Sequence, residues 1–248
     1  MLKNHFPSKE YLENKEVMEF YHNFEDKSIF ENECCQECKG RCCKKCGCSY
    51  YVEDFEDLSL NGLKTELNKG DKSIVSTLEV SYANHRYCVS PILMIRVRNE
   101  GRGVVDLFSE KTRCSLLTKD GCPYSFENRP TGGIMLIPFK NGSEFDCKTL
   151  ETANQIAIDG WKRYQKVLSR LVKYYTGRSL DERLKEEVGH TIDALASYLL
   201  TAPSYTTEQV ELLGNIQYMN DDLTAYARPD ALALCKKAST ALGIYRSI

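Results

Sequence analysis

Seven cysteines lie within fifteen residues near the start of this chain, and this cluster limits what the segment can fold into. The sequence from Cys34 to Cys48 reads CCQECKGRCCKKCGC and holds seven of the 12 cysteines in the chain. It contains two glycines, many basic residues and no apolar period, so a hydrophobic core cannot order it. We expect a loop or short turns that are ordered by bound metal and disordered without it.

The cysteine spacings are those of a metal site. Two residues separate Cys35 from Cys38, three separate Cys38 from Cys42, and five separate Cys42 from Cys48. Such short spacings allow a tight turn to bring two sulfur atoms to one ion or cluster. Seven thiols exceed the four that one zinc ion or one iron–sulfur cluster uses. Because adjacent cysteines seldom bind one metal together, Cys34 and Cys43 are expected to be buried thiols, groups that support the ligands, or ligands of a second metal.

The composition of the chain and the charges near the cysteines favour metal binding over disulfide bonds. Disulfide scaffolds are typically short, secreted and poor in core, whereas this chain is 42% hydrophobic and its charged N-terminal segment has no apolar run of a signal peptide. Cations near thiols favour the deprotonated form that binds metal. The basic residues of the cluster are Lys39, Arg41, Lys44 and Lys45, against the single acidic residue Glu37. An ordinary solvated basic loop is the alternative interpretation of these charges.

Three distal cysteines complete the candidate set. Seven residues lie between Cys114 and Cys122, which stand one just before and one just after an expected turn, and Cys147 follows later. Two sulfur atoms at the base of such a hairpin face one site. The candidate ligands are Cys38, Cys42, Cys43, Cys48, Cys114, Cys122 and Cys147. Among them we rank Cys38, Cys42 and Cys48 first, with a fourth ligand from Cys114, Cys122 or Cys147.

The pattern of apolar residues predicts an α+β protein in three parts. Residues 9–27 have the spacing of an amphipathic helix, within an N-terminal helical segment over residues 1–33. Residues 34–148 form a small cysteine-rich metal-binding domain with short strands. Residues 149–248 form a C-terminal helical bundle, because four amphipathic segments follow one another there. These segments are Leu150–Thr176, Leu180–Leu200, Thr206–Asp222 and Pro229–Ile244.

Within the middle region we expect one helix and three strands. The helix covers Asp54–Gly70, and the first strand covers Cys88–Arg98 with alternating residues near its end. That strand is expected to form a hairpin with Gly103–Phe108, and a third strand covers Gly133–Phe139. Arg96 and Arg98 would share one strand face, which predicts either an anion site or an exposed basic surface.

The bulk properties exclude some partners. The formal net charge is −2 and the isoelectric point about 6.2, so no overall positive field draws the chain to nucleic acid or to an anionic membrane. The longest apolar runs are much shorter than a membrane-spanning helix. We therefore expect a cytoplasmic protein whose partners are a metal and a protein substrate or docking partner, with no nucleic acid and no membrane.

The order of the motifs resembles a known family. The cluster from Cys35 to Cys43 is followed by Arg113-Cys114-Ser115-Leu116-Leu117, by GCPYSFENRP over residues 121–130, and by Cys147. This order resembles the cysteine-cluster proteins known by a CxxCxxCC motif, and it covers residues 34–148. The resemblance implies a domain that holds zinc or an iron–sulfur cluster. The chain departs from the family in two ways. Three residues separate Cys38 from the adjacent pair that begins at Cys42, where the family usually has two, and no cysteine follows soon after Pro130.

Three functional hypotheses follow. The first is a cysteine-ligated metal protein with a structural or redox role, holding an iron–sulfur cluster of the 4Fe–4S kind or Zn²⁺. The second is a methyltransferase, because the cysteine plan is also similar to that of the flagellin lysine methylases, which use S-adenosylmethionine. The third is a protein-interaction module that its metal folds. Binding of S-adenosylmethionine distinguishes the second hypothesis from the other two.

Overall fold

The computed structural model divides the chain into two compact units. It describes residues 40, 42–44, 47–83, 86–107, 112–124, 128–141, 144–149, 151–201, 207–216, 219 and 224–242. The first unit comprises residues 1–76 and 92–176, and the second comprises residues 77–91 and 177–248. The expected N-terminal helix over residues 9–27 lies outside the described residues.

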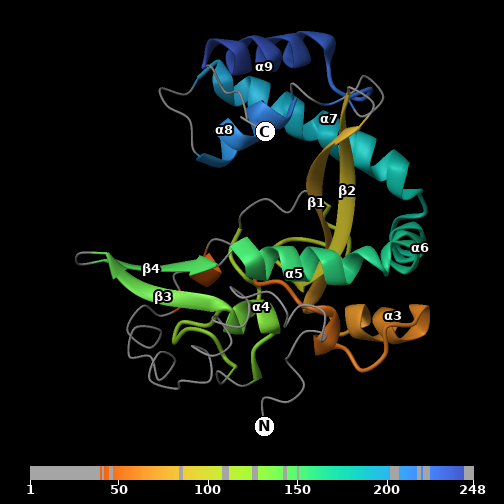
Figure 1. The fold of residues 1–248 in the computed structure, drawn as a ribbon, viewed down its shortest axis with the longest axis vertical. Coiled ribbons are helices and arrows are strands. Elements are labelled where there is room, and N and C mark those ends of the chain that lie inside the picture. The colour runs from red at the N-terminus through yellow and green to blue at the C-terminus, as the bar shows by residue number, and fades with distance from the viewer. Residues whose placement is uncertain are drawn as a thin grey trace. The chain divides into compact units, whose positions relative to one another are not determined.

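The described elements confirm a mixed α+β protein (Figure 1). Two strands, β1 (Lys72–Ala83) and β2 (Arg86–Val97), contribute residues to both units. The other elements of the first unit are η3 (Cys42–Lys44), η4 (Val52–Asp54), α3 (Leu60–Asn68), α4 (Thr131–Ile134), β3 (Leu136–Asn141), β4 (Glu144–Thr149), α5 (Glu151–Lys162) and α6 (Gln165–Thr176). The other elements of the second unit are α7 (Leu180–Leu199), α8 (Thr207–Ile216) and α9 (Pro229–Ala241).

The sheets differ from the expected hairpin. Strand β2 pairs with β1, which the sequence analysis missed, and not with residues 103–107, the described part of the expected partner strand. Residues 103–107 instead run alongside β1, where Ile74 pairs with Val105 in parallel. The amide of Arg98, just after β2, donates to the carbonyl of Asp71 at 2.8 Å. Because the chain at the end of β2 already bonds to the residue before β1, residues 103–107 pair with the other edge of β1.

A second sheet consists of β3 and β4. The two strands are antiparallel, with Leu136 opposite Thr149 and Pro138 opposite Cys147. The expected strand Gly133–Phe139 therefore begins later, because residues 131–134 form α4. No segment corresponding to β4 was predicted from the sequence.

Helix α3 begins later than predicted because a serine caps it. The hydroxyl oxygen of Ser59 accepts a hydrogen bond from the amide of Gly62 at 3.2 Å, which satisfies one donor of the first turn. Asp54, the expected first residue of this helix, lies in η4 and accepts from the amide of Tyr51 at 2.7 Å. The same carboxylate accepts from the Thr131 hydroxyl at 2.6 Å, so it joins α4 to the chain before α3.

Helices α5 and α6 belong to the first unit, whereas the sequence analysis placed them in a C-terminal part that starts at residue 149. The indole of Trp161, which is 0% exposed, donates to the carbonyl of Tyr50 at 2.8 Å. The Gln165 side chain accepts from the Leu93 amide at 2.8 Å and donates to the Leu93 carbonyl at 2.8 Å. These long-range bonds tie both helices to β2 and to the segment before η4.

In the second unit, α9 contacts both α7 and α8 (Figure 1). Helix α7 starts with a capping box formed by Ser179 and Glu182. Helix α9 starts at Pro229, as predicted from a proline at the first helical position. No helix in the described part of the chain is long and apolar enough to cross a membrane.

Candidate metal centre

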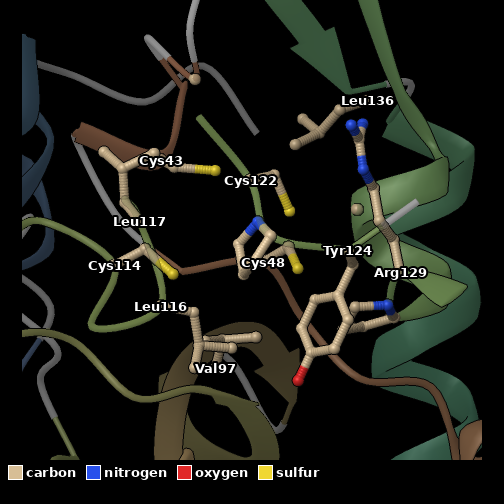
Figure 2. A pocket seen from close by; sticks show the side chains of 14 residues that line it. Cys43, Cys48, Val97, Cys114, Leu116, Leu117, Cys122, Tyr124, Arg129 and Leu136 are labelled. Atoms are coloured by element: carbon tan, nitrogen blue, oxygen red, sulfur yellow. The ribbon is translucent and has the colours of Figure 1, made fainter. Parts of the chain in front are cut away.

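Four cysteines from two segments that are far apart in sequence line one cavity of the first unit. They are Cys43, Cys48, Cys114 and Cys122. Figure 2 shows their sulfur atoms around the same hollow. The cavity has a volume of about 60 Å³. Because the segments are far apart in sequence, tertiary structure is required to assemble this set.

Main-chain hydrogen bonds fix the first segment, which carries Cys43 and Cys48. Cys43 lies in the short helix η3, and its carbonyl accepts from the amide of Cys114 at 2.7 Å. The carbonyl of Cys48 accepts from the amide of Val97 at 2.9 Å, and Ser49 pairs with Arg96. Residues 48 and 49 therefore lie against the end of β2, and Cys43 lies beside Cys114.

The turn between Cys114 and Cys122 has the geometry expected from the sequence. The amide of Thr118 donates to the carbonyl of Gly121 at 3.0 Å, and the amide of Gly121 donates back to Thr118 at 3.3 Å. Gly121 has φ of 107°, a value that favours glycine. This closed turn keeps the two cysteines at its base, where both line the cavity.

The Gly132-Gly133 pair allows α4 to approach the cysteine segment. A Cβ atom on Gly132 would lie 2.4 Å from the carbonyl oxygen of Ser49, and one on Gly133 would lie 3.0 Å from the sulfur of Cys48. The absence of side chains here leaves room at the Cys48 sulfur. Two consecutive glycines after Arg129-Pro130 were the available sequence signal for such a close approach, and the sequence analysis did not use it.

We expect Gly133→Ala to weaken metal binding without destabilising the metal-free chain. The added methyl group would occupy space next to the Cys48 sulfur, and Gly133 lies in a helix, where alanine is otherwise favoured over glycine. Metal content after purification should fall, while the free energy of unfolding of the metal-free variant should match that of the metal-free wild type within about 1 kcal/mol. Unchanged metal content would show that the Cys48 sulfur does not need this space.

The remaining wall of the cavity is mainly apolar. Figure 2 places Leu116, Leu117, Val97 and Leu136 around the sulfur atoms, together with the phenol of Tyr124. The other lining residues are Gly40, Pro123, Arg129, Pro130 and Gly133. An apolar wall limits water access and lowers the local dielectric constant, which are the means by which proteins tune a metal centre.

Burial and mutual proximity disfavour free thiolates at this site. Burial raises the pKa of the Cys48 thiol far above its ordinary value, the neighbouring Cys114 and Cys122 raise it further, and Arg96 lowers it. Burial likewise raises the pKa of Tyr124, with a contribution from the same cysteines. Cys48 thus lies within electrostatic range of both Cys114 and Cys122. A bound metal cation would reverse this preference for the neutral thiol, because a thiol that coordinates a metal is deprotonated.

The structure clarifies some of the predicted ligands. Cys43, for which three roles were open, lines the cavity with Cys48, Cys114 and Cys122. Cys42 lies in η3 and Cys147 lies on β4, but the structure does not describe the side chain of either. Cys38 lies outside the described residues. The roles of Cys38, Cys42 and Cys147 therefore stay predictions from the sequence.

The four sulfur atoms are not gathered at a single point. Within the ranges that the structure describes, no group of three or more His, Cys, Asp and Glu side chains is close enough to hold one metal ion. The cysteines are instead distributed around the cavity wall. A donor set of four thiols in an apolar wall still fits a thiolate-bound group that is larger than one ion.

The two arginines of the predicted anion site, Arg96 on β2 and Arg98 just after it, are held by main-chain groups. Arg96 donates through Nη2 to the carbonyl of Gly47 at 2.8 Å, and Arg98 donates through Nε and Nη2 to the carbonyl of Lys72 at 3.1 and 2.8 Å. Both guanidinium groups therefore bind main-chain oxygen atoms. Neither arginine is an exposed residue, so the alternative of an exposed basic surface is wrong.

We compared the chain with models of protein families, with curated proteins and with solved structures. None of these comparisons gave a significant match. The resemblance of residues 34–148 to the CxxCxxCC proteins therefore stays a prediction from the sequence.

Proposed function

We propose that this chain binds a cysteine-ligated metal centre in the cavity lined by Cys43, Cys48, Cys114 and Cys122, with a redox or structural role. The observation that carries the proposal is that four cysteines from two separate segments line one cavity. Cysteine is often a buried apolar residue, but four cysteines on the wall of one cavity exceed what packing alone explains. Soft thiolate ligands select zinc, copper(I) and iron–sulfur clusters.

An iron–sulfur cluster is favoured over zinc. A zinc ion needs each sulfur at about 2.3 Å, which requires the four sulfur atoms to meet at one point. The described cysteines are spread around a cavity of about 60 Å³, several times the roughly 10–15 Å³ that a cavity needs to hold one water molecule. A cluster spaces its four thiolate ligands around a core of several atoms, which fits this arrangement better.

The chain itself would supply the ligands and their surroundings. The four thiolates would hold the centre, and the apolar side chains of Val97, Leu117 and Leu136 would exclude water from it. An iron–sulfur cluster supplies one-electron transfer when bound. Zinc at the same ligands would supply folding energy only.

The direct test is metal and acid-labile sulfide content of the full chain after anaerobic purification. We expect iron and sulfide in equal amounts, close to four of each per chain for a 4Fe–4S cluster, with absorption in the visible range that bleaches on reduction. Stoichiometric zinc without sulfide in a colourless protein would reverse the choice of metal. A protein that contains no metal and takes up neither iron nor zinc would contradict the proposal.

A further inference from the structure

Both main-chain polar groups of Gly47, the residue before Cys48, are bound by side chains from the end of β2 and the residues after it. The amide of Gly47 donates to Oδ1 of Asn99 at 2.8 Å in a buried hydrogen bond. The carbonyl of Gly47 accepts from Nη2 of Arg96 at 2.8 Å. Asn99 is only 3% exposed, so water does not readily replace it as a partner.

Val97, on the same stretch of chain, contacts the backbone of Gly47 and of Cys48. A Cβ atom on Gly47 would lie 2.3 Å from the carbonyl oxygen of Val97, so the two backbones are in direct contact. The amide of Val97 also donates to the carbonyl of Cys48 at 2.9 Å. Residues 47 and 48 thus have fixed positions relative to residues 96–99, even though η3, the helix that precedes them, has only three residues.

We propose that Arg96 and Asn99 are positioning residues for the metal centre, which fix the Gly47–Cys48 backbone and thereby the direction of the Cys48 thiolate. This inference rests on the function proposed above. Among the described residues that line the cavity neither Arg96 nor Asn99 appears, so both act through Gly47 and do not touch the bound group. Arg96 has a second effect, because its positive charge lies near thiolates that are negatively charged when they bind metal.

Arg98 provides a matched control on the same stretch of chain. It also donates to a main-chain carbonyl, but the acceptor is Lys72 and not a residue of the cysteine segment. Substitution of Arg96 or Arg98 by glutamine removes one positive charge and one guanidinium in each case. Only the Arg96 substitution loosens the backbone next to Cys48.

The experiment compares Arg96→Gln, Arg96→Lys, Asn99→Ala and Arg98→Gln in the full chain, each titrated with a competing chelator against wild type. Loss of a group that orients a metal ligand without touching the metal typically lowers metal affinity by about 10–100-fold. We expect a loss of this size for Arg96→Gln and Asn99→Ala. Arg96→Lys keeps the charge and one donor, so its loss should be smaller. Arg98→Gln should stay within about twofold of wild type, because its partner lies outside the site.

A second measurement separates positioning from general destabilisation. The reduction potential of the bound centre should become more negative in Arg96→Gln, because a nearby positive charge stabilises the reduced, more negative state. It should change less in Arg96→Lys and in Arg98→Gln. Equal effects of Arg96→Gln and Arg98→Gln on affinity and potential would overturn the inference, as would wild-type affinity in both Arg96→Gln and Asn99→Ala.

The two proposals fail in different ways. If wild-type protein binds no metal, the function proposed above is wrong and this inference is wrong with it. If wild-type protein binds metal and the Arg96 and Asn99 variants bind it equally well, only the positioning role is wrong.

Discussion

Substitution of Cys48 or Cys114 by serine is expected to remove most of the bound metal. Both cysteines line the cavity, and Cys114 is only 6% exposed. Structural zinc sites contribute about 10–16 kcal/mol, or roughly 2.5–4 kcal/mol for each of four ligands, which corresponds to about 60- to 700-fold in affinity for each ligand lost. Iron, zinc and sulfide measured after anaerobic purification give the result directly. Cys43→Ser and Cys122→Ser should behave in the same way.

Cys235 is the matched control for this series. It is a buried cysteine, 0% exposed, in α9 of the second unit, and its thiol donates to the carbonyl of Ile192 at 3.8 Å. Cys235→Ser should retain full metal occupancy. The substitution should cost at most about 1–3 kcal/mol of stability, the range for a buried hydroxyl left without a partner. Metal lost on changing Cys235 but retained on changing Cys48 and Cys114 would contradict the assignment of the site.

The same series tests ligands that the sequence predicts and the structure leaves undecided. Cys38→Ser, Cys42→Ser and Cys147→Ser should each lower metal content if these residues bind a metal. If only the four cavity cysteines matter, one centre accounts for all the metal. If metal content falls in two independent steps, the excess of thiols in residues 34–48 serves a second centre.

Removal of the metal is expected to unfold the parts of the first unit that surround the cavity. Cys43 lies in a three-residue helix, and Cys114 and Cys122 flank a turn, so little regular structure orders these segments without ligation. The free energy of metal binding, about 10–16 kcal/mol for structural zinc, is as large as the total stability of about 5–15 kcal/mol of a typical domain. Chelation should therefore open residues 40–50 and 112–124 to proteolysis.

The helices of the second unit should survive this treatment. Most of their buried residues are apolar, among them Val188, Ile192, Leu213 and Ala231, and α9 contacts both α7 and α8. Limited proteolysis with mass spectrometry, before and after chelation, distinguishes the two units. If residues 40–50 and 112–124 remain resistant after metal loss, the centre does not order them, and a sensing or catalytic role would be favoured over a structural one.

Local sequence signals predicted several elements well. The expected segment Leu180–Leu200 corresponds to α7, and the segment expected to begin at Pro229 corresponds to α9, because helix starts depend on residues within one helical turn. The turn between Cys114 and Cys122 was also predicted, since glycine at position 121 favours the positive φ that it adopts. Strand β4 was missed because its segment, EFDCKT, has few apolar residues.

The sequence by itself determined that this chain concentrates thiols in a segment that cannot form a core, and that two further cysteines stand at the base of a turn. Only the tertiary structure decided that Cys43 lies beside Cys48, Cys114 and Cys122, because vicinal cysteines are equivalent in a spacing pattern until the backbone orients them. It also decided that α5 belongs with the cysteine segment, through the bond from Trp161 to Tyr50. Contacts between residues more than a hundred positions apart depend on how the chain packs, and local propensity and periodicity carry no information about them.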